Sequence, residues 1–331
     1  MKALVITEKN QPLVVQEVAD PKAGPGEAIV RVRAAALNHR DVWIQKGQYA
    51  GLKYPIVPGS DGAGVVVEST AADWVGKEVI INPALSWGQS PAYQDPTDFR
   101  ILGLPDDGTL AEYVKVPVQN LAQKPEHLSF EEAAALPLAG VTAYRALMTR
   151  GKVQAGEKVL ISGIGGGVAL FAFQFALAAG AKVYVTSGSP EKLDRAMAMG
   201  ASGGVNYKNS DWVEQLRHLA GAFDVTIDGA GGDGMGELLD LAAPGSRVVF
   251  YGATRGNPSS LVVRRIFWKQ LNVLGSTMGS PEDFEAMTGF VKKHKIHPIV
   301  DRVFELEEGE AAFRWMEGES QFGKIVVRTS S

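Results

Sequence analysis

Hydrophobic and polar residues alternate with a period of two along the first part of the chain, up to about residue 120. Gly and Pro interrupt this pattern at short intervals, as in "YPIVPGSDGAGVVVE" (54–68) and "GTLAEYVKVP" (108–117). Short strands joined by tight turns produce such a pattern, so we predict a small β-rich domain here. Residues 84–108 are polar, Pro-rich and without periodicity, which predicts a functional loop or a lobe packed on its own core.

The pattern changes at about residue 129, where Ser129 and Glu132 form the sequence signature of a helix start. Beyond it, segments typical of strands alternate with segments typical of helices. The strands are expected over 157–163, 181–188, 203–207, 223–231 and 246–254, and the helices over 167–180, 189–200, 210–221 and 235–245. This alternation predicts an α/β fold with a doubly wound parallel sheet. The tail from residue 298 returns to mixed helix and strand, and its final strand needs a partner in the first domain.

A glycine-rich turn, "GIGGGVA" (163–169), joins the first of these strands to the helix that follows. Glycine permits positive φ and a close approach of the main chain to a pyrophosphate, and the helix N-terminus offers amide groups. The predicted ligand is a dinucleotide, held by Gly163, Gly165, Gly166, Gly167 and Val168. The strict G-x-G-x-x-G pattern is not met, because Val168 stands at its last position, so a tight turn without a ligand is the alternative.

The next strand ends in "VTSGSPEK" (185–192), where the choice between NADH and NADPH is usually made. An NAD-binding unit carries Asp or Glu there to hold the ribose 2′-hydroxyl. Ser187, Gly188 and the nearby Lys192 suit a 2′-phosphate better, so we predict NADPH over NADH. Glu191 leaves the choice open, and Ser189 is also a plain helix cap.

Ligands bind at the carboxyl ends of the strands in a doubly wound sheet. Two later strands end in "DGAGG" (228–232) and "FYGAT" (250–254), so we expect Gly229, Ala230, Tyr251 and Gly252 to form part of the cofactor wall. Ser276, in "LGSTMG", is a further candidate for this wall.

Composition removes several classes of function. The length of 331 residues and the apolar share of 45% allow two domains, each with its own core. A net charge of −4, with acids and bases scattered along the chain, gives no reason to expect a nucleic-acid or membrane partner. Zero cysteines exclude disulfides, thiolate catalysis and cysteine-based metal sites.

The N-terminus lacks the features of a signal peptide, and the apolar run 168–179 is too short to cross a bilayer. We therefore expect a cytoplasmic protein.

The chain resembles the medium-chain dehydrogenase/reductase superfamily over essentially its whole length. The order and spacing of "GPGEAIVRVRAAALNHRDVWIQKG", "YPIVPGSDGAGVVVE", "AAALPLAGVTAYRAL" and the terminal "GKIVVR" carry the resemblance. It implies a Rossmann domain, residues 124–265, inserted in a GroES-like β-rich catalytic domain formed by 1–123 and 266–331, with the active site in the cleft. It also implies a homodimer or a homotetramer.

The alcohol-dehydrogenase branch of this family binds a catalytic zinc ion, and its three ligand positions match Asn38, Ser60 and about Leu138. All three ligands are therefore replaced, and residues 84–108 contain no cysteine for a structural zinc. Zinc needs three or four N, S or carboxylate donors at one point. His39, Asp41 and Asp61 offer such donors, but His39 matches a position that is not a ligand in the family. We predict no bound metal, with a zinc-type alcohol dehydrogenase of unconventional ligands as the alternative.

The chain is more similar to the zinc-free quinone oxidoreductase and enone reductase branch. In that branch an "A-L-N-x-x-D" segment and a following tyrosine line the nicotinamide pocket, and Asn38, Asp41 and Tyr49 match these positions. The resemblance implies an NADPH-dependent reductase of quinones or α,β-unsaturated carbonyl compounds. Asn38 and Tyr49 would stabilise the anion formed by hydride addition, and Tyr49 or water would supply the proton. Asp41 is a third candidate for the catalytic site, although its position is more typical of a residue that bonds main-chain amides.

The resemblance also suggests roles for three further residues. Thr142 would help to seat the nicotinamide, Tyr207 would flank the 2′-phosphate, and Lys324 would lie near the cofactor. Core packing, a surface tyrosine and a strand-edge charge are the respective alternatives. An NADPH-binding redox sensor without catalysis is the remaining alternative for the whole protein.

Overall fold

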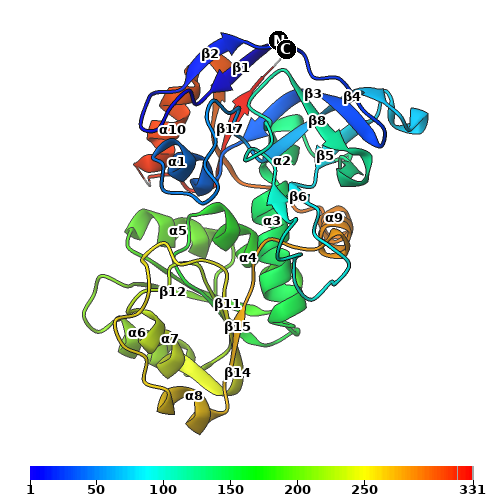
Figure 1. Cartoon of the computed structure of the whole chain (residues 1–331). Helices are drawn as coiled ribbons and strands as arrows, with labels where there is room; N and C mark the ends of the chain where they lie inside the picture. The colour runs from blue at the N-terminus through cyan, green and yellow to red at the C-terminus, as the bar shows by residue number, and fades with distance from the viewer. Residues whose placement is uncertain (319, 330–331) are drawn as a thin grey trace. The chain divides into compact units, whose positions relative to one another are not determined.

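The computed structural model describes residues 1–318 and 320–329, and the chain forms two compact units (Figure 1). The first unit comprises Met1–Val141 and Gly279–Ser331, and the second comprises Thr142–Met278. The predicted boundaries, 123/124 and 265/266, differ from these. Residues 130–135 pack on strands of the first unit, and residues 272–275 pair with a strand of the second, so tertiary contacts move both boundaries.

A seven-stranded sheet forms the centre of the first unit, with strand order β16-β17-β3-β4-β5-β9 and with β8 also paired to β3. These strands are β3 (Glu27–Ala36), β4 (Asp61–Ser69), β5 (Glu78–Ile81), β8 (Tyr113–Pro117), β9 (Leu121–Gln123), β16 (Val300–Glu305) and β17 (Lys324–Arg328). A separate hairpin pairs β1 (Lys2–Val5) with β2 (Val14–Glu17). The prediction of a β-rich first domain is confirmed, and so is the return of the tail, because β17 pairs with β3.

The helical segments of the first unit are α1 (His39–Gln45), η1 (Ala72–Trp74), η2 (Val118–Asn120), α2 (Phe130–Ala135), α9 (Pro281–His294), η4 (Leu306–Glu308) and α10 (Gly309–Glu317), and the chain passes to the second unit within α3 (Pro137–Tyr144). The predicted helix start is confirmed, because the Glu132 amide donates to Ser129 Oγ and the Ser129 amide donates to the Glu132 carboxylate. The α2 helix packs on β3, β4 and β17.

Residues 84–108 form a lobe with a short antiparallel pair, β6 (Ala84–Leu85) and β7 (Arg100–Ile101). The buried Trp87 stacks edge-on against Phe99, with ring centres 5.5 Å apart, and its Nε1 donates to the Ser90 carbonyl. Leucines of this lobe also belong to the main core of the first unit. The lobe is therefore anchored to the domain rather than built on a core of its own.

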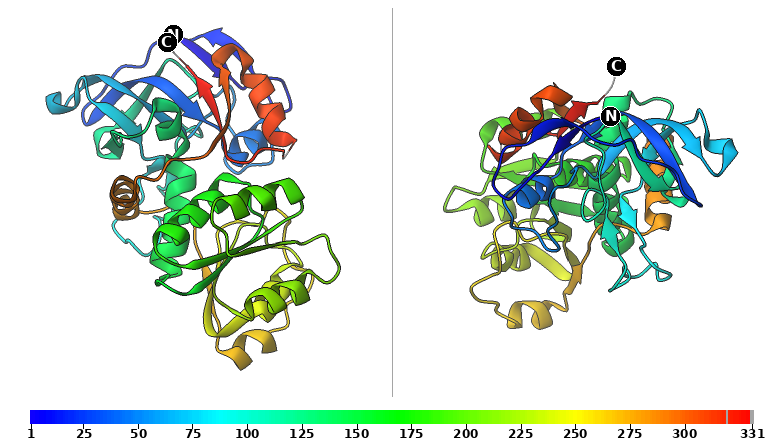
Figure 2. Two further views of the ribbon diagram at one scale, coloured as in Figure 1. Left: turned by 180° about the vertical axis from the view of Figure 1, so that it is seen from behind. Right: turned by 45° about the horizontal axis from the view of Figure 1, so that its top comes forward.

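The second unit is a six-stranded parallel sheet with strand order β12-β11-β10-β13-β14-β15. Its strands are β10 (Lys158–Ile161), β11 (Lys182–Ser187), β12 (Gly203–Asn206), β13 (Phe223–Asp228), β14 (Ala242–Phe250) and β15 (Asn272–Gly275). Its helical segments are η3 (Arg145–Arg150), α4 (Gly167–Ala178), α5 (Pro190–Ala198), α6 (Trp212–Ala220), α7 (Met235–Leu241) and α8 (Arg264–Lys269). Helices cover both faces of the sheet (Figures 1 and 2), which confirms the predicted doubly wound fold.

Every strand and helix predicted between residues 157 and 254 is present, with somewhat different ends. The α4 helix is apolar nearly all round because most of it is buried, with Phe171, Phe173 and Phe175 inside the core. None of the described helices has the length and apolar character needed to cross a membrane.

Candidate functional site

Asn38 lies at the junction of β3 and α1, in extended backbone just before the first helical residue. Its backbone N–H donates to Asp41 Oδ2 over 2.8 Å, so this carboxyl closes the first turn of α1. Asp41 is completely buried, and its Oδ1 has no hydrogen-bond partner among the described residues. Burial raises the pKa of this carboxyl above its ordinary value. The geometry supports the structural alternative for Asp41 rather than the catalytic one.

The Asn38 side chain is held on both sides by charged groups. Its Nδ2 donates to Asp61 Oδ2 over 2.9 Å, and its Oδ1 accepts from Lys324 Nζ over 2.7 Å. Lys324 Nζ also donates to Asp61 Oδ2 over 3.0 Å and to the Leu37 carbonyl over 2.7 Å. Asn38 is 8% exposed, Lys324 4% and Asp61 0%, so the three side chains form one buried network.

Strand register explains why these residues meet. Ala36 at the end of β3 pairs with Asp61 at the start of β4, and it also pairs with Val326 near the start of β17. The side chains of Asp61 and Lys324 therefore lie on either side of Asn38, which follows the end of β3 by two residues. Asp61 Oδ1 accepts the Leu138 backbone N–H over 2.7 Å, so both oxygens of this carboxylate have partners.

Lys324 was assigned to the cofactor site by the family resemblance. An ammonium group has three N–H donors, and those of Lys324 have acceptors at the Leu37 carbonyl, Asn38 Oδ1 and Asp61 Oδ2. A direct bond from Lys324 to a cofactor is therefore not supported, and neither is the alternative of a charge at a strand edge. Asp61 was expected only as one of three possible metal donors. It begins the apolar strand β4 and is buried there, and a buried carboxylate needs a hydrogen-bonding or charged partner.

Tyr49 is connected to the same region through Arg40. Arg40 Nε donates to the Tyr49 hydroxyl oxygen over 3.3 Å, and the guanidinium carbon lies 5.0 Å from the centre of the Tyr49 ring. Arg40 Nη1 donates to Ser60 Oγ over 2.6 Å and to the Leu102 carbonyl over 2.8 Å. Because arginine can only donate, the phenolic proton of Tyr49 remains available. Arg40 was missed, since a charged residue in a short helix carries no sequence signal for burial.

The residues at the zinc-ligand positions do not fit a zinc ion. Asn38 offers an amide, Ser60 a hydroxyl that already accepts from Arg40, and Leu138 an apolar side chain whose backbone N–H donates. The Lys324 ammonium lies between the Asn38 and Asp61 oxygens. Within residues 1–318 and 320–329, no group of three or more His, Cys, Asp or Glu side chains is gathered for a metal, and His39 is exposed.

The glycine-rich turn of the second unit fits a dinucleotide. Gly163 and Gly165 have φ values of +65° and +132°, which favour glycine. A Cβ added to Gly163 or to Gly166 would meet nothing within 4 Å, so neighbouring side chains do not fill the space beside the turn. The α4 helix begins at Gly167, followed by Val168, and its first amides point to this turn.

Positively charged residues gather at the end of β11. A Cβ added to Gly188 would lie 2.8 Å from the Tyr207 hydroxyl oxygen and 2.8 Å from Lys208 Cε. Arg255 Nη2 donates to the Tyr207 hydroxyl over 3.4 Å, with its guanidinium carbon 5.1 Å from the ring centre. Lys192 lies against Gly165, where an added Cβ would be 3.3 Å from its Nζ. Lys208 and Arg255, which the sequence did not indicate, thus lie beside Gly188 and Tyr207 and form a positive cluster.

The hydroxyls near this cluster have local partners. Ser187 Oγ accepts the Ser189 N–H over 3.2 Å, and Ser189 Oγ accepts the Lys192 N–H over 3.3 Å, so Ser189 caps α5 as one alternative expected. Ser189 also donates to the Glu191 carboxylate over 2.6 Å, and this bond lowers the pKa of that exposed carboxyl. Glu191 is therefore bonded within its own turn.

The ends of β13 and β14 pack against each other. The Tyr251 ring lies so close to Gly229 that a Cβ there would be 2.5 Å from it, and a Cβ at Gly252 would be 2.9 Å from the Gly229 carbonyl oxygen. Ala230 accepts the Arg255 N–H over 2.8 Å, which joins these strand ends to the positive cluster. These predicted wall residues are therefore brought together.

Asp228 was not anticipated at these strand ends. Ser162 Oγ donates to its Oδ1, and the Gly231 N–H donates to its Oδ2 over 2.7 Å. Burial raises the pKa of Asp228, and burial followed by the nearby Asp228 charge raises the pKa of the Tyr251 phenol.

The two remaining candidates occupy different surroundings. Thr142 is buried within α3. Ser276 follows β15, and its N–H donates to the Phe250 carbonyl over 2.9 Å. Its buried hydroxyl has no hydrogen-bond partner among the described residues, so it has capacity for a ligand.

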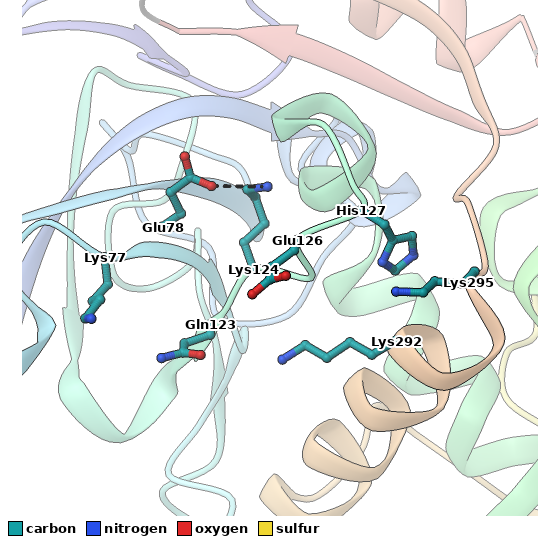
Figure 3. Close-up of a pocket in the computed structure, with 8 residues that line it drawn as sticks. All are labelled: Lys77, Glu78, Gln123, Lys124, Glu126, His127, Lys292 and Lys295. Carbon is teal, nitrogen blue, oxygen red and sulfur yellow. Dashed lines mark ion pairs between the residues drawn. The ribbon is translucent and has the colours of Figure 1, made fainter.

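A separate cavity of about 420 Å³ lies in the first unit and contains none of the predicted site residues (Figure 3). Its lining residues are mostly charged: Lys77, Glu78, Gln123, Lys124, Glu126, His127, Lys292 and Lys295. Lys124 pairs with Glu78 over 3.2 Å, and Lys292 and Lys295 lie at the C-terminal end of α9, where cations offset the helix dipole. An ion pair and a helix end therefore account for four of the charged residues in this cavity, without a ligand.

Comparisons with known proteins cover both units. The model of the alcohol dehydrogenase GroES-like domain matches residues 24–126, and that of the zinc-binding dehydrogenase matches residues 167–293. Zinc-type alcohol dehydrogenase-like protein YogA of Leptosphaeria maculans is 36% identical, covering 96% of this chain and 94% of its own. Quinone oxidoreductase-like protein 2 of Rattus norvegicus is 30% identical, covering 98% and 91%. The crystal structure of an NAD-dependent alcohol dehydrogenase is 39% identical, covers 100% of both chains and gives a TM-score of 0.93.

These relatives divide between zinc-type alcohol dehydrogenase-like and quinone oxidoreductase-like proteins, so they do not select one branch. They agree with the predicted combination of a GroES-like domain and a Rossmann domain. The chain belongs to the medium-chain dehydrogenase/reductase superfamily of NAD(P)-dependent oxidoreductases.

Proposed function

We propose that the protein is a zinc-independent, NADPH-dependent reductase of quinones or α,β-unsaturated carbonyl compounds. The observation that carries this proposal is the Asn38 amide, held between Asp61 and Lys324 at a position where a zinc-type enzyme has a metal ligand. Since this donor set does not fit zinc, the first unit has to stabilise negative charge with neutral hydrogen-bond donors.

The positive cluster of the second unit supports NADPH as the cofactor. Lys208 and Arg255 are exposed beside Gly188 and Tyr207, and the nearby Glu191 is bonded to Ser189. A 2′-phosphate carries two charges at most and accepts several hydrogen bonds, so it suits arginine and lysine donors. NADH, with a 2′-hydroxyl, would leave these cations without a ligand.

When bound, the reduced nicotinamide supplies a hydride to the β-carbon of the conjugated carbonyl. The electron pair of the double bond then moves to the carbonyl oxygen, giving an enolate, or a hydroquinone anion from a quinone. Asn38 has a second Nδ2–H, for which no described residue is an acceptor, and this N–H stabilises the anion. Tyr49, whose oxygen accepts from Arg40, donates its phenolic proton to complete the reduction.

The test is NADPH and NADH oxidation, followed by absorbance, with a panel of enones and quinones in the presence and absence of a chelator. We expect turnover with NADPH that the chelator leaves unchanged. Asn38→Ala and Tyr49→Phe should each lower kcat by more than they change the Kd of NADPH, while the exposed His39→Ala should keep most of the activity. Tight NADPH binding without turnover of any substrate would support a redox sensor instead.

A zinc-type alcohol dehydrogenase is the second candidate, favoured by the names of the YogA relative and of the similar crystal structure. Elemental analysis of the purified protein separates the two. Stoichiometric zinc, together with alcohol oxidation lost on chelation, would replace the first proposal by the second.

We also propose that the chain forms a homodimer or homotetramer. The edge strand β15 has largely exposed side chains, and the adjacent segment exposes Phe267 (61%) and Trp268 (71%). Apolar side chains this exposed are typical of a contact surface. Light scattering should give a mass of two or four chains, and replacing both aromatic residues by Ser should lower it. A monomeric wild-type protein would contradict this proposal.

A further inference from the structure

The two polar atoms of the Asn38 side chain meet opposite partners. Its carbonyl oxygen faces the Lys324 ammonium at 2.7 Å, and its nitrogen faces the Asp61 carboxylate at 2.9 Å. If the amide were turned over, its NH₂ group would face an ammonium and its oxygen would face a carboxylate. Both contacts would then be repulsive, so the ion pair permits one orientation of the amide.

This orientation determines which hydrogen-bonding group of the Asn38 amide remains available to a ligand. An amide has two N–H donors and one carbonyl oxygen. The oxygen and one N–H are used by Lys324 and Asp61, and the other N–H has no acceptor among the described residues. The ammonium on the oxygen also polarises the amide and strengthens its N–H as a donor.

We propose that Lys324 and Asp61 are positioning residues for Asn38, which fix its amide so that an N–H, and not a carbonyl oxygen, remains for the substrate. This inference rests on the proposed function and deepens it, because a fixed donor favours substrates whose oxygen becomes negative in the reaction. It assigns Lys324 a role inside the first unit rather than on the cofactor.

The placement of the pair supports this role. Asp61 begins β4 and Lys324 begins β17, and both strands belong to the sheet that contains β3. Side chains on paired strands hold a site more rigidly than side chains on loops. A buried ion pair gains little stability over apolar residues of similar volume, so stability alone does not explain two charges here.

The test is a double-mutant cycle on kcat for an enone substrate with NADPH. One arm is Asn38→Ala. The other is Lys324→Met combined with Asp61→Asn, which removes both charges and leaves no unpaired ion. Each arm should lower kcat by about 100-fold, the usual loss for one oxyanion donor. All three substitutions together should lower kcat no further, because Lys324 and Asp61 act through Asn38.

A purely structural role would give the opposite pattern. The losses would then multiply in the triple variant, and that result would overturn the inference. The Kd of NADPH should stay within twofold in all variants, and the exposed Lys292→Met serves as the matched lysine control. If the charge-free variant does not fold, Lys324→Arg provides the second measurement: it keeps the cation and should retain part of kcat, whereas a loss as large as that of Asn38→Ala would count against the inference.

A second readout does not depend on turnover. In protein labelled with ¹⁵N-asparagine, the Asn38 side-chain signal is the one lost in Asn38→Ala. We expect its N–H bonded to Asp61 to exchange with solvent at least 10-fold faster in the charge-free variant than in the wild type. Slow exchange in a wild-type protein that reduces no enone or quinone would refute the proposed function but keep the positioning role. Equal exchange in both proteins would refute the positioning role.

Discussion

The candidate sites of the two units hold their cations in opposite ways. Lys324 in the first unit is buried, and all three of its N–H donors have acceptors within 3.0 Å. Lys208 and Arg255 in the second unit are exposed, and the hydrogen bond of the Arg255 guanidinium goes to the Tyr207 hydroxyl over 3.4 Å. A cation removed from water needs compensation from its neighbours, whereas an exposed cation keeps its hydration until a ligand replaces it. We therefore expect the buried Lys324 to organise its site, and the exposed Lys208 and Arg255 to recognise a ligand.

Removing the buried cation should have the largest effect on stability. Lys324→Met leaves the Asp61 carboxylate buried without its ion-pair partner. We expect the free energy of unfolding to fall by about 3–5 kcal/mol, the usual result of breaking a buried pair from one side. Urea denaturation followed by circular dichroism measures it. A loss below about 1 kcal/mol would mean that the Lys324–Asp61 pair contributes no more than an exposed ion pair, and the contrast with the exposed cations would disappear.

Removing the exposed cations should change ligand binding instead of stability. Arg255→Ala combined with Lys208→Ala should raise the Kd of NADPH by about 10- to 100-fold, because charge-assisted hydrogen bonds to the 2′-phosphate are lost. The Kd of NADH should stay nearly unchanged, since it lacks this phosphate. Fluorescence titration of both cofactors measures the two constants. Equal losses for NADPH and NADH would show that these residues do not read the 2′-phosphate.

The buried Asp41 allows a pH test of the first unit. Burial raises the pKa of this carboxyl in the folded protein above its ordinary value of 3.8, despite the opposing effect of Arg40. Ionisation therefore destabilises the folded state more than the unfolded state as pH rises past that value. Asp41→Asn removes this penalty, so the variant should be more stable than the wild type by about 1 kcal/mol at pH 7.

The gain from Asp41→Asn should shrink towards pH 4, where the wild-type carboxyl takes up its proton in both states. Urea denaturation of both proteins at a series of pH values gives the comparison. A gain that is the same at every pH would come from packing and not from the charge.

An exposed lysine of the first unit should give the smallest effect. Lys292 lines the cavity near the end of α9, and none of the described residues forms an ion pair with it. Lys292→Met should change the free energy of unfolding by less than about 0.5 kcal/mol, as is usual at surface positions. A loss comparable to that of Lys324→Met would show that exposure is not what separates the two kinds of lysine.

Local sequence patterns were sufficient for most of the fold. Strands and helices between residues 157 and 254 were predicted because periodicity and glycine turns are properties of short segments. The boundaries of the two units could not be predicted in this way, because they depend on whether β15 pairs with β14 and on where α2 packs. These are choices of tertiary structure that periodicity does not record.

The candidate site was predicted in a similar, incomplete way. Asn38 and Tyr49 came from the resemblance, but their partners did not. Asp61 and Lys324 are 263 positions apart in the sequence and meet only through the register of three strands. Arg255 reaches Tyr207 from a loop 48 residues away, whose path the sequence pattern does not describe.

The place of β17 in the sheet also bears on how the protein is made. This strand is synthesised after the whole second unit, and it completes a sheet whose other strands were mostly synthesised before the second unit began. Until β17 reaches β3, the Asp61 carboxylate has no lysine partner and the Asn38 amide has no fixed orientation. The proposed catalytic residue Asn38 is therefore fixed in place only after the strands of the second unit have been synthesised, and a chain cut short before residue 324 would lack this arrangement.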